Sequence, residues 1–493
     1  MMKPIQALLV CALLMLWNCK QRSSADSATA DAYNEIVANS SDRDWKDIKK
    51  EGVLRALVVY SSTSYFLYKG QAMGFEYELL KQLAKDLNLE LELVVSDNLD
   101  TQFEVLNSGE VDLIAHGMTV TNQRKWEVDF TEYLYLTKQV LVQKKPDNFR
   151  RLSWKSLHNA LIHDPIELIN DTVSIRRNSA YYERIMSLSN EIGGTIHIDT
   201  LDSKLSTGEI INMVADGKIK YTIADENLAR INASSRPILD ISVPISFSQR
   251  IAWVTRKKSK EFRKRVNEWI VSQRKKKHYN VIYNKYFKNK RSFRRRTKSD
   301  YYSLKNNQIS AYDDLIKTYA KELNWDWRLL ASQVYQESKF DPEASSWAGA
   351  QGLMQVMPAT AESLNIKDIS DPKESLRGGT TYLKQIYEEF DKVEDSLSRL
   401  KLTLAAYNCG LGHVRDAQRL ADAEGLNRNA WSNISEMLLK LRYREYYNKP
   451  FIKYGYVRGS EPVNYVNQIF ERYEHYNAFI KVEEEAELTP KVK

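Results

Sequence analysis

A single glutamate stands where a carboxylic acid could exchange a proton with a bound substrate. Glu337 ends a stretch of helical periodicity that begins at Trp327, and the run Phe340-Asp341-Pro342 stops that helix. A carboxylate in the last turn of a helix faces the negative end of the helix dipole, and apolar neighbours such as Met354 would remove water from it. Both effects raise the pKa of a carboxyl group. The sequence therefore indicates a general acid of the kind that protonates the leaving oxygen of a glycosidic bond.

Other catalytic groups are not expected beside this glutamate. A retaining glycosidase uses a second carboxylate about 5 Å from the first, but Asp341 and Glu343 follow the helix stop and are typical of caps or surface acids. Cys409 is the only cysteine beyond residue 19, and the lone His413 nearby is typical of a structural histidine, so a thiol nucleophile is not expected. No HExxH motif or Cys/His cluster occurs, so we expect no metal and no cofactor.

Four motifs in this half of the chain carry a family resemblance. They are Gln336-Glu337-Ser338, then GAQGLMQ (349–355) with MPATA (357–361), then AAYNCG (405–410), and finally EPVNYV (461–466). Together they closely resemble the soluble lytic transglycosylase family, which has a goose-type lysozyme fold, over about residues 308–480. The resemblance implies cleavage of peptidoglycan glycan strands at the β-1,4 bond between N-acetylmuramic acid and N-acetylglucosamine. No water is consumed, and the products carry 1,6-anhydromuramoyl ends.

The resemblance also implies a role for each matching residue. The substrate's own N-acetyl group acts as nucleophile, and Glu337, first an acid, then deprotonates the C6 hydroxyl of the muramoyl residue. The supporting residues are Ser338, which orients the substrate or the glutamate, Gly352, which lets backbone approach the sugar, Met354 and Gln355, which line the cleft, Tyr407 and Asn408, which contact the acetamido group, and Tyr465, which hydrogen-bonds Glu337.

The first half of the chain alternates strand and helix patterns. Val53–Tyr60 and Leu91–Val95 have the composition of buried strands, and Gly74–Leu89 between them has helical spacing. Short strand patterns recur after about residue 170, at 172–175, 195–198 and 221–223. This alternation predicts parallel α/β sheets in two lobes, with a cleft between the lobes.

Three motifs in these lobes resemble the family 3 periplasmic solute-binding proteins over about residues 51–290. They are GMTVTNQR (117–124) followed by VDFT (128–131), Gly74-Phe75-Glu76, and Ile223-Ala224-Asp225. By that resemblance Arg124 clamps an α-carboxylate, Thr119 adds a hydroxyl and Asp225 takes an ammonium group, so the expected ligand is an amino acid or a muropeptide. Arg176 and Arg177 favour a ligand with extra carboxylates, such as a stem peptide.

A second interpretation treats Arg124 and Asp225 as surface ion pairs on a degenerate binding fold. It is favoured by Tyr60-Ser61-Ser62, which stands where amino-acid binders often place an acid.

The N-terminus predicts an export signal. Lys3 precedes an apolar run from Ala7 to Trp17, which is short for a membrane span and typical of a signal-peptide core. Cys19 after this run resembles the lipobox cysteine of bacterial lipoproteins, although Trp17 and Asn18 replace the usual small residues. We therefore expect anchoring through a lipid on Cys19 at the periplasmic face of the outer membrane. Without lipidation the protein would be soluble in the periplasm.

Charge is concentrated in one segment. The net charge is +8, yet residues 256–298 alone hold 19 Lys/Arg against two Glu. This segment is either a solvated helix face or a surface attracted to anionic lipid headgroups or wall polymers. An exported protein is not expected to bind nucleic acid. Lys260–Phe287 is predicted to be one long basic helix, and the aperiodic residues that follow are predicted to be a linker.

The predicted fold class is multidomain, a two-lobed α/β periplasmic-binding-protein domain followed by a mainly α lysozyme-like domain. The boundaries are 1–18 for the signal peptide, 19–50 for a lipidated tether, 51–290 for the solute-binding domain, 291–307 for a basic linker, 308–480 for the transglycosylase domain and 481–493 for a disordered tail. Helices are expected at 312–323, 327–336, 358–364, 376–390, 396–408 and 412–420.

Three functions remain open at this point: a lyase regulated by ligand closure of the N-terminal lobes, a hydrolytic muramidase on the same fold, and a non-catalytic lipoprotein that senses muropeptides or amino acids.

Overall fold

The computed structural model describes residues 38, 40–96 and 99–480, so the predicted signal peptide, Cys19 and the predicted tail lie outside the described residues. The chain forms two compact units. One holds the residues up to Phe66 and residues 73–298, and the other holds residues 67–72 and those from Ser299 onward. Within the described ranges, no helix combines the length and hydrophobicity needed to cross a bilayer.

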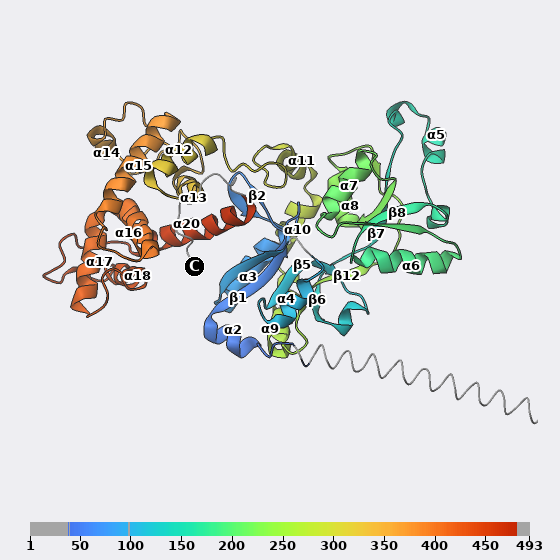
Figure 1. Cartoon of the computed structure of the whole chain (residues 1–493), viewed down its shortest axis with the longest axis horizontal. Coiled ribbons are helices and arrows are strands. Elements are labelled where there is room, and N and C mark those ends of the chain that lie inside the picture. The colour runs from blue at the N-terminus through green and yellow to red at the C-terminus, as the bar shows by residue number, and fades with distance from the viewer. Residues whose placement is uncertain (1–37, 39, 97–98, 481–493) are drawn as a thin grey trace, which may run out of the picture. The chain divides into compact units, whose positions relative to one another are not determined.

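The first lobe of the first unit is built on a five-stranded sheet (Figure 1). In spatial order its strands are β4 (Glu90–Ser96), β1 (Val53–Val59), β5 (Leu113–Thr119), β12 (Gln249–Thr255) and β6 (Asp129–Thr137). β1 is parallel to β4 and β5, but β12 is antiparallel to β5 and β6, so the sheet is mixed rather than wholly parallel. Its helices are α2 (Trp45–Glu51), α3 (Phe75–Leu87), α4 (Gln102–Ser108), η1 (Arg124–Trp126) and α9 (Lys260–Arg274).

The second lobe has a five-stranded sheet of its own. Its strands are β11 (Leu239–Asp240), β7 (Gln139–Lys144), β10 (Tyr221–Asp225), β8 (Thr172–Arg176) and β9 (His197–Leu201), and its helices are η2 (Phe149–Arg151), α5 (Trp154–Asn159), η3 (Pro165–Leu168), α6 (Ala180–Ile192), α7 (Thr207–Ala215) and α8 (Glu226–Ala233). The chain enters this lobe between β6 and β7, at Lys138, and returns between β11 and β12. Two crossings of this kind are typical of two-lobed domains that close around a ligand.

Three segments differ from the sequence-based expectation. The end of the expected tether is folded, because Asp44 forms a capping box on α2 and Arg43 pairs with buried Asp112. The prediction of a single long basic helix is wrong. Helix α9 ends before Lys275, and the chain continues as α10 (Lys277–Tyr283) and the π-helical η4 (Asn284–Lys288). The start of the expected linker is helix α11 (Lys290–Lys298), which buries Phe293.

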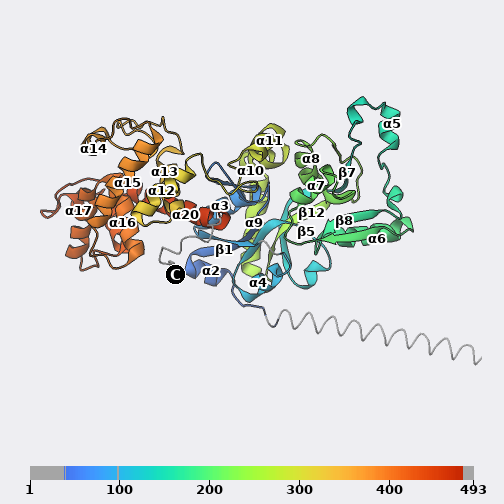
Figure 2. The same ribbon diagram turned by 45° about the horizontal axis from the view of Figure 1, so that its top comes forward.

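The second unit is helical, as the apolar spacing predicted. Its helices are α12 (Asp313–Leu323), α13 (Trp327–Ser338), α14 (Pro358–Ser363), α15 (Pro372–Glu388), α16 (Ser396–Cys409), α17 (Leu411–Ala423), α18 (Trp431–Lys440), α19 (Arg444–Tyr447) and α20 (Ser460–Phe479). Helices α13 and α16 both pack on α20 (Figure 2), and α17 packs on α16 and α18 (Figure 1). The last three helices were not predicted. Together these contacts bring the ends of α13, α16 and α20 to one place.

A hairpin from early in the chain completes the second unit. Strands β2 (Phe66–Tyr68) and β3 (Gln71–Met73) pair with each other, and residues 67–72 belong to this unit. The Ser303 amide donates to the Leu67 carbonyl (3.0 Å), and the Tyr476 hydroxyl donates to the Gly70 carbonyl (2.9 Å). A side chain at Gly70 would lie within 3 Å of both Tyr476 and Phe340, so only glycine fits. The hairpin therefore covers the C-terminal end of α13.

Candidate active site

Glu337 occupies the last turn of α13. Asp326 caps the N-terminus of this helix by accepting from the Arg328 amide, and Lys339 ends it in the left-handed conformation. The face of α13 toward the core is apolar, with Leu330 and Val334 fully buried. Glu337 is half-buried, because it lies in the last turn of the helix, where the core no longer covers the whole side chain. The carboxyl group is thus held at the edge of the hydrophobic core with one side accessible.

Burial raises the pKa of Glu337 to about 7, and a hydrogen bond donated by the Tyr465 hydroxyl opposes this rise. Among the described residues, no other acid or base shifts this pKa. A carboxyl group with a pKa near 7 is part protonated at neutral pH, so it can both donate and accept a proton. This is the property that the sequence predicted for the residue.

Tyr465 and Tyr407 flank the glutamate from two different helices. Tyr465 lies in the second turn of α20 and is buried, and its hydroxyl donates to Glu337 Oε1. Tyr407 lies near the end of α16, and its hydroxyl donates to the Met354 carbonyl (2.8 Å). Burial and the nearby Glu337 carboxylate raise the pKa of both phenols, so both stay protonated. Tyr465 thus connects α20 to the end of α13, and Tyr407 connects α16 to the segment that holds Met354.

Residues 352–355 pack inside the helical unit behind the site. Gly352 has φ +78°, and a side chain there would lie 2.1 Å from the Ile369 carbonyl oxygen. The glycine is therefore needed for close packing against residue 369, which is a different reason from the approach of a sugar. Met354 is fully buried, and its side chain packs against Gly379 of α15. The side-chain amide of Gln355 donates hydrogen bonds to the carbonyls of Ala344 (2.8 Å) and Gly352 (3.0 Å).

The two remaining predicted contacts differ in exposure. Ser338 is buried, and its hydroxyl donates to the Val334 carbonyl (3.2 Å), one turn back along α13. Asn408 is exposed at the end of α16. The side chain of Asn408 is thus available to a ligand, whereas that of Ser338 is engaged within its own helix.

The alternative catalytic groups are arranged as the sequence indicated. Asp341 and Glu343 are both exposed, and Asp341 accepts a hydrogen bond from the Glu343 amide (3.1 Å), as a turn cap does. Burial raises the pKa of the Cys409 thiol to about 12, so the thiolate nucleophile is scarce at neutral pH.

Gln333 is a polar residue at this site that the sequence did not single out. It precedes Glu337 by four residues, so the two side chains share one face of α13. Gln333 is fully buried, and both atoms of its amide group lack a hydrogen-bond partner of good geometry. Its position in an apolar helical stripe was the available signal, since a buried amide group is costly unless it is hydrogen-bonded.

The first unit holds a second polar site, between its lobes. Arg124 donates to the carbonyl of Thr119 (3.0 Å) in its own lobe and to that of Asn178 (3.1 Å) in the other. Asn178 also donates to Asp100 (2.6 Å) across the same boundary. A cavity of about 820 Å³ lies here, and residues of both lobes line it, among them Asp100, Arg124 and Asn178. The predicted Thr119 and Arg124 thus lie together at the interface of the lobes.

Asp225 is buried deeper, at the end of β10. Burial raises the pKa of Asp225 to about 7, although the positive charges of Arg176 and, to a smaller extent, Arg124 lower it. Asp225 therefore lies within electrostatic reach of both arginines. One oxygen of Asp225 has no hydrogen-bond partner, and neither has Nε of Arg176. Glu76, which the sequence marked only as a family landmark, likewise has one unpartnered buried oxygen and a pKa raised by burial to about 7.

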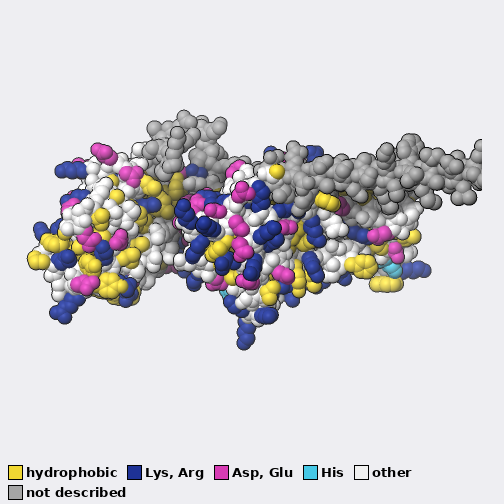
Figure 3. Space-filling model, turned by 90° about the horizontal axis from the view of Figure 1, so that it is seen from below, with side chains coloured by type: hydrophobic (Ala, Val, Ile, Leu, Met, Phe, Trp, Pro, Cys, Tyr) yellow, Lys and Arg dark blue, Asp and Glu magenta, His cyan; other side chains and the backbone are white. Residues whose placement is uncertain are grey.

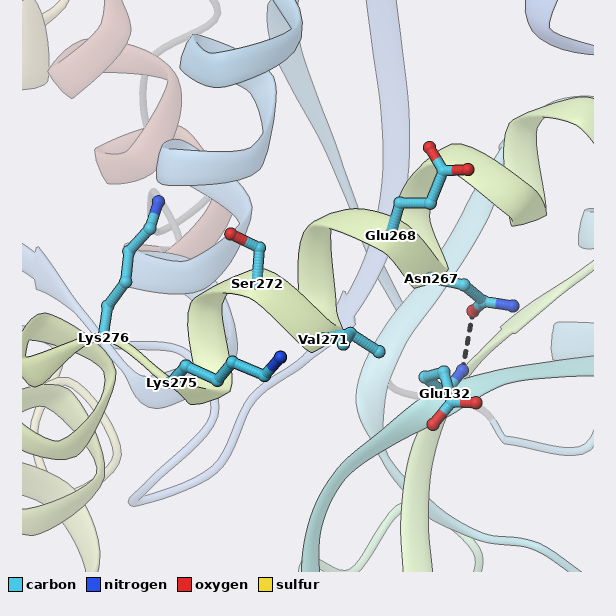
Figure 4. A pocket seen from close by; sticks show the side chains of 7 residues that line it. All are labelled: Glu132, Asn267, Glu268, Val271, Ser272, Lys275 and Lys276. Carbon is cyan, nitrogen blue, oxygen red and sulfur yellow. Dashed lines mark hydrogen bonds between the residues drawn. The ribbon is translucent and has the colours of Figure 1, made fainter.

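Another pocket of the first unit is unrelated to either site. It lies along α9 beside β6, where the Asn267 side chain accepts a hydrogen bond from the Glu132 amide (2.6 Å), and Lys275 lines its edge (Figure 4). Apart from Glu132, its lining residues lie in the basic segment 256–298, for which the sequence left open a solvated helix face or a surface attracted to anionic polymers.

Comparison with known families separates the same two parts of the chain. Residues 57–289 match the bacterial extracellular solute-binding proteins of family 3, and residues 314–429 match the Transglycosylase SLT domain. Among solved structures, an ancestral arginine-binding protein bound to arginine is similar at 23% identity and a TM-score of 0.40, covering 48% of this chain and 98% of its own. Holo ArgBP from T. maritima is similar at 22% identity and a TM-score of 0.39, covering 48% and 97%.

Several relatives that match across both parts carry the name membrane-bound lytic murein transglycosylase F. The protein of that name from Desulfosudis oleivorans is 34% identical over 436 residues, which are 87% of this chain and 91% of the relative. The one from Aeromonas salmonicida is 30% identical over 442 residues, which are 87% and 83%.

A solute-binding module followed by a helical unit with this glutamate site defines a lytic transglycosylase, a lyase that cleaves peptidoglycan without hydrolysis. The chain belongs to the membrane-bound lytic murein transglycosylase F family.

Proposed function

We propose that Glu337 is the single acid and base of the transglycosylase reaction. It protonates the glycosidic oxygen as the bond to C1 of the muramoyl residue breaks, while the acetamido oxygen of the same sugar attacks C1. Glu337, now a carboxylate, takes the proton of the C6 hydroxyl as that oxygen displaces the acetamido group. The proton returns to Glu337, and the product is a 1,6-anhydro ring.

The observation that carries this proposal is the isolation of Glu337. Burial raises its pKa to about 7 against the opposing effect of the Tyr465 hydrogen bond, and no second carboxylate among the described residues contributes. Tyr465 would hold the carboxyl in place, and exposed Asn408 would bind the acetamido group. Ser338, Gly352, Met354, Gln355 and Tyr407 would support the wall, because their polar groups or packing are engaged within the protein.

Digestion of purified peptidoglycan tests the proposal. The full chain should release anhydro-muropeptides, which are lighter by one water than the products of a muramidase. Glu337→Gln should fold and release none. Hydrated products would support the muramidase alternative instead, and unchanged activity of Glu337→Gln would refute the assignment of the catalytic residue.

For the first unit, we propose a ligand that carries both carboxylate and ammonium groups, such as an amino acid or a stem peptide. The support is the set of buried, unpartnered charged atoms on Asp225, Arg176 and Glu76, which are costly unless a ligand satisfies them. Binding would hold the lobes closed and change the catalytic rate through the segment that joins the first lobe to the hairpin of residues 67–72.

Calorimetry on the full chain with a synthetic stem peptide tests the ligand, and the rate of peptidoglycan digestion with and without that peptide tests the regulation. Arg124→Ala should abolish both effects, whereas Arg151→Ala, an exposed arginine of the same unit, should leave them intact. Binding that survives in Arg124→Ala would contradict the proposed site.

We also propose that the protein is held in the cell envelope by a lipid on Cys19, at the periplasmic face of the outer membrane. The support is the position of this cysteine after the apolar run. Cys19→Ala should move the protein from the membrane fraction to the soluble periplasmic fraction, and an unchanged distribution would contradict lipidation.

A further inference from the structure

Four aromatic side chains are exposed on one connection of the second unit. This connection, the aromatic loop, comprises residues 441–459 between α18 and α20 and includes α19. The exposed fractions are 47% for Tyr443, 36% for Phe451, 61% for Tyr454 and 56% for Tyr456. Figure 3 shows exposed hydrophobic side chains interspersed with basic ones at the left end, over the helical unit. Single exposed apolar residues are ordinary, but a group of this size on one loop indicates a binding surface.

The backbone of the aromatic loop is held firmly although its rings are exposed. Buried Asp416 of α17 accepts hydrogen bonds from the amides of Lys453 (2.8 Å), Tyr454 (2.6 Å) and Gly455 (3.1 Å). Although burial alone would raise the pKa of Asp416, the amides of Lys453 and Tyr454 and the Arg419 side chain lower it, so the anchor is ionised at neutral pH. A loop ordered in this way loses little conformational entropy when a ligand binds to its rings.

The aromatic loop lies next to the elements that carry the catalytic residues. Its last residue is followed by α20, whose Tyr465 donates to Glu337 and lies about 8 Å along the helix axis from Ser460. At its other contact, the ring of Tyr454 fills the space above Gly412 of α17, where a side chain would lie 2.5 Å from that ring. Gly412 follows the exposed Asn408 by only four residues. The loop therefore adjoins α17 and α20, and these two helices are next in sequence to Asn408 and carry Tyr465, respectively.

The chemistry of the aromatic loop fits a glycan strand. Pyranose rings present apolar C–H faces that can stack on flat aromatic rings. The loop also holds five Lys/Arg and one Glu, and this positive balance is complementary to the carboxylates of muramoyl residues and their stem peptides. Its proximity to the catalytic site favours the substrate itself as the occupant over an unrelated protein or a lipid surface.

We propose that the aromatic loop is a second glycan-binding surface, which holds the sugar chain beyond the bond cleaved at Glu337 by stacking on Tyr454 and Tyr456. This inference rests on the proposed function, because it takes the substrate of Glu337 as its ligand. It predicts that long strands bind more tightly than short ones and that the loop sets this preference.

The test uses the full chain with Glu337→Gln, which binds without cleaving, and co-sedimentation with purified peptidoglycan sacculi. Adding Tyr454→Ala and Tyr456→Ala should weaken binding about tenfold, because both aromatic faces are removed. Tyr454→Phe with Tyr456→Phe should restore it, because the aromatic faces remain. Trp154→Ala, which removes an exposed aromatic residue of the first unit, is the matched control and should bind like the parent.

A second measurement uses chains with Glu337 intact. The ratio of kcat/KM for long glycan strands to that for tetrasaccharides should fall in the double alanine variant. Equal sacculus binding and an equal ratio in a folded double alanine variant would overturn the inference, and so would an equal loss of binding in Trp154→Ala. Failure of the proposed function is separate, because it shows as retained cleavage in Glu337→Gln.

Discussion

Replacing Tyr465 by phenylalanine should move the pH dependence of catalysis in a predictable direction. The Tyr465 hydroxyl donates to Glu337 and, among the described residues, is the one group that opposes the effect of burial on the pKa of Glu337. A hydrogen bond to a charged group contributes about 1.5–3 kcal/mol, and 1.36 kcal/mol corresponds to one pKa unit. Because Glu337 is only half-buried and water can replace part of the lost bond, we expect a rise of about one unit, near the lower end of that range.

The sign follows from the role of the carboxyl group. A general acid must be protonated, so kcat/KM of the parent enzyme should fall as the pH rises through about 7. In Tyr465→Phe this descending limb of the pH profile should lie about one pH unit higher. The maximum of kcat/KM should also be lower, because the carboxyl group is less well positioned.

The assay is the initial rate of anhydro-muropeptide release from pH 5 to 9. Tyr407→Phe is the matched control: its hydroxyl donates to the Met354 carbonyl rather than to Glu337, so its limb should move much less. A limb that stays in place in folded Tyr465→Phe, or moves to lower pH, would refute the reasoning.

Three further predictions concern stability. The folded-state pKa of Glu337 is raised above its ordinary value, so the stability contributed by its protonation is present below about pH 4.5 and is lost as the pH rises through about 7. Glu337→Gln should therefore raise the free energy of unfolding by up to about 3 kcal/mol at pH 8 and hardly at pH 4, and equal gains in thermal scans would contradict this. Gln333→Leu should stabilise or leave the protein unchanged in urea titrations, because its amide is buried without a good partner; a marked loss would show that it has one. Gly352→Ala should lower the melting temperature far more than Gly425→Ala, which shares its positive φ but meets no atom within 4 Å; equal shifts would show that the Ile369 contact is relieved.

The elements with strong periodicity were predicted best. The apolar spacing of residues 327–336 and the stop after it located α13 and placed Glu337 at its end, and local hydrophobicity located β1, β4 and α3. The antiparallel place of β12 between β5 and β6 was not predictable, because strand order depends on contacts between residues more than 100 positions apart. The break at Lys275 was missed because the apolar stripe continues across it.

The side-chain chemistry of the sites was only partly predictable. The link between Tyr465 and Glu337 was expected from the motif. The internal roles of Gly352 and Met354 depend on α15, which lies beyond the motif in sequence and packs against it only in the folded unit. Gln333 and Glu76 were missed for a related reason, since burial of a polar group is a property of its surroundings and not of its spacing.

The hairpin at Gly70 gives the protein an unusual order of assembly. More than 200 residues separate it from Tyr301, whose carbonyl accepts from the Lys69 amide. During synthesis this turn leaves the ribosome long before the helices that it covers. The hairpin must therefore wait for its partners until the chain has been made as far as Tyr476, and the lytic half is completed by a segment from the start of the chain. A protease that cuts once near residue 299 would not release that half intact, and a fragment starting there would leave Tyr476 without its backbone acceptor.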